Sequence, residues 1–133
     1  MTIRALVVDD NENNLVLEKD LLELAGFEVF EAENGATGVA IAKKEIPDII
    51  IMDVRLPDMR GSEAAKILRQ YQATSLIPIV FVTASVMAEG KEEISSIVYS
   101  KFIGKPINTR TFANDIKAFI SAHLSEISSK GGK

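Results

Sequence analysis

Short runs of apolar, often β-branched residues alternate along the chain with longer stretches in which apolar residues recur every three or four positions. The short runs predict five strands, at 5–8, 28–32, 49–52, 79–82 and 102–104. The longer stretches predict helices at about 12–25, 35–44, 62–70, 87–98 and 109–127. Strands that alternate with helices pair in parallel through right-handed crossovers. The pattern therefore predicts a doubly wound α/β domain, with a five-stranded parallel sheet and helices on both faces.

Two of the predicted helices show where they begin. Asn11 and Asn34 are plausible N-caps of the first and second helices, and Gly26 follows the expected end of the first. The fourth helix is the least regular, because Gly90 interrupts it. The first helix should bury one apolar face, consisting of Leu17, Leu21 and Leu24.

The last helix has the clearest periodicity. Its apolar residues recur at spacings of three and four and predict one buried stripe, made of Phe112, Ile116, Phe119, Ile120, Leu124 and Ile127. His123 should occupy a partly exposed position on this helix, and a phosphohistidine role there is improbable. Residues 1–127 are expected to form one domain, and the polar segment 128–133 is expected to be a disordered tail.

Composition excludes several kinds of function. The chain has 133 residues, 47% of them hydrophobic, which suits one domain with an ordinary core. Its net charge of -4 and the lack of a basic block argue against binding to nucleic acid or to an anionic membrane. The absence of cysteine removes disulfides, thiolate metal sites and thiol nucleophiles. With no signal-peptide pattern and no long apolar run, a cytoplasmic protein is expected.

Polar residues follow the carboxyl ends of four of the predicted strands. Asp9 and Asp10 follow the first strand, Asp53 the third, Thr83 the fourth and Lys105 the fifth. The carboxyl ends of parallel strands share one edge of the sheet, so these side chains should meet there. Three neighbouring carboxylates repel one another unless a cation lies among them. Mg²⁺ fits best, because Mg²⁺ accepts carboxylates, waters and phosphate oxygens as ligands. Mn²⁺ is a second candidate.

This set of groups suits phosphoryl transfer. Such a reaction needs a positioned nucleophile and neutralisation of the phosphoryl oxygens, which Lys105 and Thr83 would supply together with the metal ion. Asp53 stands alone at the end of the central strand and is the best candidate nucleophile, because carboxylates can form acyl phosphates. The adjacent pair Asp9 and Asp10 is better suited to holding the metal.

The sequence resembles the receiver domain of two-component response regulators, over about residues 3–124. The matching motifs are Val7-Val8-Asp9-Asp10-Asn11, the stretch from Asp53 to Gly61, Thr83-Ala84 and Lys105-Pro106. The resemblance implies that Asp53 accepts a phosphoryl group from a phosphohistidine of a sensor histidine kinase or a phosphotransfer protein. It also implies that Asp10, Asp53 and the backbone carbonyl of Arg55 bind Mg²⁺ directly, while Asp9 acts through a water.

The resemblance carries further expectations about structure and signalling. It implies the strand order 2-1-3-4-5 and a cis peptide bond between Lys105 and Pro106. Thr83 and Phe102 match the switch pair of the family, although Phe102 considered alone is equally a core residue. Because no effector domain follows the last helix, output is expected through an unknown protein target, and the chain is expected to be a monomer or a weak dimer.

The sequence departs from the family pattern at a few positions. Residues 97–100 read Ile-Val-Tyr-Ser where receivers usually have a small and acidic stretch, which puts the end of the fourth helix in question. Gly38 occupies a position that is often acidic, and Arg55 is larger than many residues at its position. Arg55 and Ser85 match positions that influence the lifetime of the phosphate in the family.

Other functions remain open at this stage. Asp9-Asp10-Asn11 considered alone is more typical of a helix-capping turn. A Mg²⁺-dependent phosphohydrolase would also use Asp53 as its nucleophile. One such family has a second Asp two residues after the nucleophile, and this sequence has Arg55 at that position. A flavodoxin-like cofactor carrier lacks its phosphate loop. The chain could also be a phosphorylation-independent scaffold, or a receiver domain cut from a larger regulator or hybrid kinase.

Overall fold

Among the residues that the structure describes, five strands occur in the predicted order, and helices separate the first four of them. The structure is a computed structural model that describes residues 2–84 and 96–131. Its elements are β1 (Arg4–Val8), α1 (Glu12–Leu24), β2 (Glu28–Ala32), α2 (Gly35–Glu45), β3 (Ile49–Asp53), α3 (Gly61–Gln70), the 3-10 helix η1 (Gln72–Thr74), β4 (Ile79–Thr83), β5 (Ser100–Gly104) and α5 (Phe112–Gly131). The strand β5 begins at Ser100, earlier than the predicted 102–104.

The strands form one parallel sheet in the order β2-β1-β3-β4-β5, so the expected order is confirmed. Val8 pairs with Met52, Asp53 with Val82, and Thr83 with Gly104. This register aligns the carboxyl ends of the four strands β1, β3, β4 and β5 at the same edge. The polar residues that end or follow those strands are thereby brought to one place.

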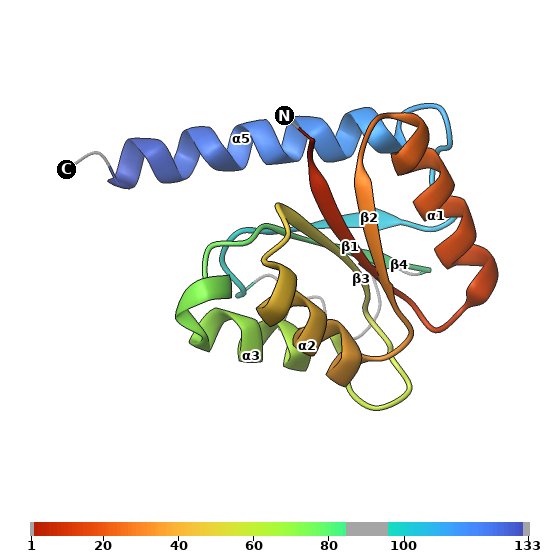
Figure 1. Ribbon diagram of the computed structural model, residues 1–133, viewed down its shortest axis with the longest axis horizontal. Coiled ribbons are helices and arrows are strands. Elements are labelled where there is room, and N and C mark those ends of the chain that lie inside the picture. The colour runs from red at the N-terminus through yellow and green to blue at the C-terminus, as the bar shows by residue number, and fades with distance from the viewer. Residues whose placement is uncertain (1, 85–95, 132–133) are drawn as a thin grey trace.

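The sheet is covered on both faces, with α1 and α5 on one side and α2 and α3 on the other (Figure 1). Successive residues of a strand point to opposite faces. On β3, Ile50 and Met52 belong to the core under α2 and α3, whereas Ile49 and Ile51 belong to the core under α1 and α5. Each of these four side chains is almost wholly buried, which explains why the strand has no polar face.

The predicted apolar face of α1 is largely wrong. The helix buries Leu15, Glu18 and Leu22, whereas Leu17 is 40% exposed and Leu24 is 85% exposed. Leu21 lies between these extremes and packs at the margin of the core. The buried stripe has the helical spacing of three and four, but a glutamate occupies its centre, so the pattern of apolar residues alone selected the neighbouring stripe.

The carboxyl-terminal part of the chain also differs from the expectation. The helix α5 continues to Gly131, through part of the segment expected as a tail. Phe112, Ile116 and Ile120 are buried as predicted, but Leu124 is 56% exposed. Most of the predicted fourth helix, 87–98, lies outside the described residues, and residues 96–99 form turns. None of the described helices combines the length and the apolar character needed to cross a membrane.

His123 is buried, in contrast to the partly exposed position expected for it. Its ring meets the ring of Tyr99 edge to face, with 4.8 Å between the ring centres. The guanidinium of Arg69 lies 5.9 Å from the centre of the Tyr99 ring and donates hydrogen bonds to the carbonyls of Val98 and Tyr99. Burial lowers the pKa of His123, and the charge of Arg69 acts in the same direction.

The depressed pKa of His123 predicts a loss of stability in mild acid. Below pH 6.5, the unfolded chain binds a proton at this residue while the folded protein resists it, so the free energy of unfolding falls as pH drops. In His123→Gln this part of the pH dependence should be absent. Urea denaturation of both proteins between neutral pH and pH 5 measures the difference, and parallel curves for the two would contradict the prediction.

Candidate functional site

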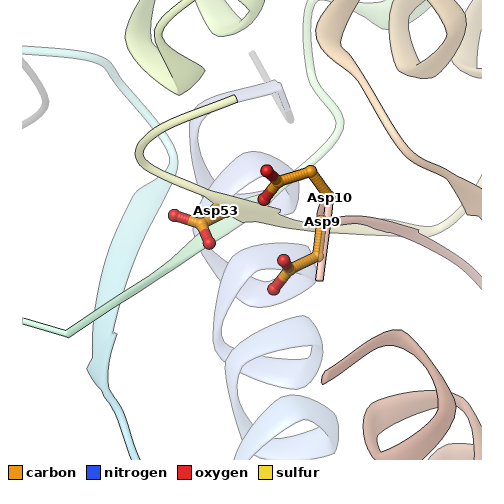
Figure 2. A group of neighbouring side chains, drawn as sticks. All are labelled: Asp9, Asp10 and Asp53. Carbon is orange, nitrogen blue, oxygen red and sulfur yellow. The ribbon is translucent and has the colours of Figure 1, made fainter. Parts of the chain in front are cut away.

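Three carboxylates gather where β1 and β3 end. Asp9 and Asp10 directly follow β1, and Asp53 is the last residue of β3. One carboxylate oxygen from each residue lies within 4.8 Å of those of the other two. Figure 2 shows the three side chains at the ends of these strands. Asp9 is buried, Asp53 is half-buried and Asp10 is exposed. Hard oxygen ligands at this separation, open to solvent on one side, fit a hydrated Mg²⁺ ion.

Asp9 and Asp53 use their two carboxylate oxygens in the same way. In each residue Oδ1 accepts a hydrogen bond from the backbone N–H two positions later, at 2.9 Å from Asn11 and 3.0 Å from Arg55. In each residue Oδ2 accepts from Lys105, at 3.2 Å for Asp9 and 2.7 Å for Asp53. The backbone thus fixes the rotamers of both acids, and the lysine links them.

Lys105 is held at the site by its main chain as well. Its N–H donates to the carbonyl of Thr83 at 2.7 Å, and its peptide bond to Pro106 is cis. Burial alone would lower the pKa of Lys105, but the hydrogen bonds and charges of Asp53 and Asp9 outweigh it, and the pKa is raised. The side chain therefore stays charged as the cation among the acids.

The remaining predicted site residues occupy different depths. Thr83 ends β4 at the same edge and is half-buried. Phe102 lies in the middle of β5, with its ring centre 6.4 Å from that of Phe81 and its side chain packed against the core under α2 and α3. The side chain of Arg55 is exposed. The structure therefore brings the acids, Lys105 and Thr83 to one edge of the sheet, and leaves Phe102 within the strand behind it.

The loop after Asp53 is fixed by hydrogen bonds between its two ends and between Asp58 and α2. Gly61 donates its N–H to the carbonyl of Val54 at 2.7 Å, and a Cβ added to Gly61 would lie 2.5 Å from the carbonyl oxygen of Asp53. Within the loop, Asp58 accepts hydrogen bonds from the first two N–H groups of α2, those of Gly35 and Ala36. These bonds lower the pKa of Asp58. The loop is thus tied to α2 and to the start of α3.

Gly38 stands where the family often has an acidic residue, and the packing of α2 explains this difference. Gly38 is buried on α2, and a Cβ there would lie 2.9 Å from Cγ2 of Val8. The glycine lets α2 approach β1 one residue before Asp9, so a larger acidic side chain at this position would require α2 or Val8 to move.

Sequence reasoning missed one acid that lies next to the site. Glu18 is only 3% exposed, on the face of α1 between Leu15 and Leu22. Burial raises its pKa to about 8; the charges of Asp9 and Asp53 act in the same direction, and that of Lys105 opposes them. The spacing of Glu18 from the two buried leucines was the signal that could have revealed it.

A doubly wound sheet with three acids, a threonine and a lysine at its carboxyl edge defines the receiver class of signalling domains. The model of the response regulator receiver domain family matches residues 5–117. The chain belongs to this family and is a receiver domain of two-component response regulators.

Individual relatives agree with this assignment. The chain is 34% identical over 120 residues to the polar-differentiation response regulator DivK of Brucella ovis, a match that covers 90% of this chain and 98% of DivK. It is 29% identical to the chemotaxis response regulator CheY4 of Vibrio cholerae, with a TM-score of 0.84, covering 90% of this chain and 99% of that one. The chain also shares its fold with the receiver domain of sensor histidine kinase PA1611 from Pseudomonas aeruginosa PAO1, at 24% identity and a TM-score of 0.83. This match covers 91% of this chain and 99% of that one. The PA1611 domain was solved with a magnesium ion coordinated in its active site cleft.

The contact of Gly61 with the backbone of Asp53 predicts that Gly61→Ala destabilises the protein. The added methyl group would meet a backbone oxygen that cannot turn away, so we expect a loss of about 1–3 kcal/mol in the free energy of unfolding. Gly35→Ala is the matched control, because its added methyl group would meet mainly the flexible side chain of Met59. Urea denaturation compares the two, and an equal or smaller loss for Gly61→Ala would contradict the prediction.

Proposed function

We propose that Asp53 is the residue that takes up the phosphoryl group, and that the donor is a phosphohistidine of a sensor histidine kinase or of a phosphotransfer protein. The observation that carries the proposal is the position of Asp53, at the end of the central strand with Oδ2 2.7 Å from the ammonium of Lys105. Asp9 is too buried to be approached by a donor. Asp10 is exposed and suits a metal ligand.

The protein groups that the transfer requires all lie at this edge of the sheet. An oxygen of the Asp53 carboxylate attacks phosphorus, a new P–O bond forms as the P–N bond breaks, and the electron pair of the broken bond passes to the imidazole nitrogen of the donor. Lys105 is placed to neutralise the phosphoryl oxygens, and the hydroxyl of Thr83 can donate a hydrogen bond to one of them. These residues act by position and charge, so no separate general base is required.

We further propose that Asp10, Asp53 and the backbone carbonyl of Arg55 hold Mg²⁺ directly, with Asp9 acting through a water; Mn²⁺ could replace it. The close approach of the three carboxylates supports this proposal, since the single ammonium of Lys105 offsets only part of their mutual repulsion. When bound, the metal would neutralise negative charge on the carboxylates and on the phosphoryl oxygens. Magnesium in the cleft of the PA1611 receiver gives the same indication by analogy.

The surface beside the site supports docking of the phosphodonor. A cavity of about 450 Å³ lies between α1 and the segment after β5, and its lining includes Leu17, Lys105 and Pro106. Leu17 and Leu24 are exposed on the same helix. We propose that the donor contacts this side of α1 in the cytoplasm, and that the downstream target is a protein rather than nucleic acid, consistent with the acidic net charge.

We propose no reaction beyond phosphorylation and dephosphorylation of the protein itself. A phosphohydrolase that turns over other substrates needs a group that transfers protons near the nucleophile. The residue two positions after Asp53, where one such family has an acid, is Arg55, and its side chain offers no acceptor for a proton.

Phosphorylation at Asp53 is the first test of the proposal. With acetyl phosphate and Mg²⁺, the wild-type protein should gain the mass of one phosphoryl group, because a small donor can reach the half-buried carboxylate. Asp53→Asn should gain none, since an amide is not a nucleophile, and a chelator should prevent the gain in wild type. Intact-protein mass spectrometry measures the adduct.

The matched control is Asp20→Asn, which removes an exposed acid from α1 and should leave the adduct unchanged. Two results would overturn the assignment: no adduct on the wild type, or an adduct of wild-type yield on Asp53→Asn.

The switch role of Thr83 and Phe102 is a second proposal and has its own test. Beryllofluoride with Mg²⁺ mimics the phosphorylated acid, and NMR shifts should then extend from the edge to β5 in wild type. In Phe102→Leu we expect the NMR shifts near Asp53 to remain and the NMR shifts in β5 to become smaller. The reason is that the aromatic ring proposed to transmit the conformational change is absent. Identical shift maps for the two proteins would exclude a role for the ring.

A further inference from the structure

The tip of the loop between β3 and α3 is tied to a helix from an earlier part of the chain. The carboxylate of Asp58 accepts two hydrogen bonds, at Oδ1 from the N–H of Gly35 at 2.7 Å and at Oδ2 from the N–H of Ala36 at 2.9 Å. These donors are the first two residues of α2. The three acids that gather at the strand ends do not include Asp58, so its place in the site is not that of a metal ligand.

Two side chains of different origin cap the start of α2. Asn34, the residue before the helix, accepts a hydrogen bond from the N–H of Thr37 at 2.8 Å. The first N–H groups of a helix have no partner within the helix, and Asn34 serves only one of them here. Asp58 serves the other two from a position 22 residues beyond Ala36.

The contact is close because α2 begins with a glycine. A Cβ added to Gly35 would crowd the side chain of Met59 and lie 3.2 Å from Oδ1 of Asp58. The hydrogen bonds from Ala36 and Gly35 lower the pKa of Asp58, so the carboxylate is ionised near neutral pH. Its negative charge suits the positive end of the helix dipole. The loop therefore supplies a charged acceptor, and the helix supplies the space for it.

The base of the same loop sets the direction of the Arg55 backbone. Arg55 and Arg60 face each other in a short antiparallel pairing, and their chain neighbours make its two hydrogen bonds, at 3.1 Å and 2.7 Å. In such a pair the N–H and C=O groups of the two facing residues point away from the opposite strand. The N–H of Arg55 accordingly donates to Oδ1 of Asp53 at 3.0 Å. The carbonyl of Arg55 leaves the pairing on this same side, toward the acids.

Asp58 lies at the tip of this hairpin. The tip consists of Pro57 and Asp58, between Leu56 and Met59, whose backbones are joined by a hydrogen bond. A hairpin this short has little stability of its own. An anchor at its tip therefore restrains the whole loop, including the direction of the Arg55 carbonyl.

We propose that Asp58 is a positioning residue, which anchors the tip of the loop to α2 and thereby holds the backbone carbonyl of Arg55 toward the metal ion. This inference deepens the proposed function and rests on it for the presence of the metal. Asp58 acts through the backbone of α2 and touches neither the metal nor the phosphoryl group in this role.

The first experiment measures the loop without metal or phosphate. Exchange of amide hydrogens with water, followed by NMR, reports how often the N–H of Arg55 is released from Asp53. In Asp58→Ala we expect exchange at Arg55 to become about fivefold faster, a factor typical of the loss of a capping side chain. Unchanged exchange at Arg55 would overturn the inference.

Asn34→Ala is the matched control, because it removes the other cap from the same end of α2 and leaves the loop intact. It should speed exchange at the start of α2 and leave Arg55 at the wild-type rate. An equal rise at Arg55 in both variants would mean that Asp58 only stabilises α2, and would also overturn the inference. Asp58→Asn keeps one acceptor oxygen and should fall between wild type and Asp58→Ala.

The second experiment measures metal binding. Titration with Mg²⁺, followed through the amide shifts of the three acids at the strand ends, gives a dissociation constant without any phosphorylation. This constant should rise about tenfold in Asp58→Ala, as is typical when a group that orients a metal ligand is removed, and stay at the wild-type value in Asn34→Ala. An unchanged constant in Asp58→Ala would overturn the positioning role. If the wild type binds no Mg²⁺, the proposed metal site fails, and exchange at Arg55 still decides whether Asp58 holds the loop.

Discussion

The bridge that Lys105 forms between Asp53 and Asp9 is the interaction on which the arrangement of this site depends. The three residues come from strands far apart in sequence, and only the parallel sheet with this strand order brings them within hydrogen-bonding distance. Two acids and one ammonium leave a net negative charge, to which Asp10 adds. The edge is therefore stable enough to form without a metal ion and negative enough to attract one.

The fold could be predicted from sequence because its strands are buried on both faces. Ile49 to Met52 is apolar at every position, which amphipathic surface strands are not, and each residue enters one of two separate cores. The meeting of the acids at the strand ends could be predicted equally well, because the carboxyl ends of parallel strands share one edge of the sheet. Their meeting required no knowledge of side-chain packing, and the structure places them together.

Helix faces were less predictable, for a reason visible in α1 and α5. The core under α1 accepts Glu18, so counting apolar residues pointed to Leu17 and Leu24, which are exposed. On α5 the buried stripe passes through His123 instead of Leu124. In both helices a titratable residue occupies a core position, and on α5 a partner from a distant element, Tyr99, lies against His123. Such partners cannot be seen in the local pattern.

These two buried groups also differ in what they connect. His123 joins α5 to the turn before β5 at the amino edge of the sheet, far from the acids in the order of each strand, and its neutral form is the one that the fold accommodates. Glu18 lies on α1, where burial raises its pKa to about 8 and favours its neutral form near neutral pH. An apolar residue would fill the space of Glu18 at lower cost in desolvation. Both buried groups are thus favoured in their neutral forms, which lowers the desolvation cost of placing them in the core.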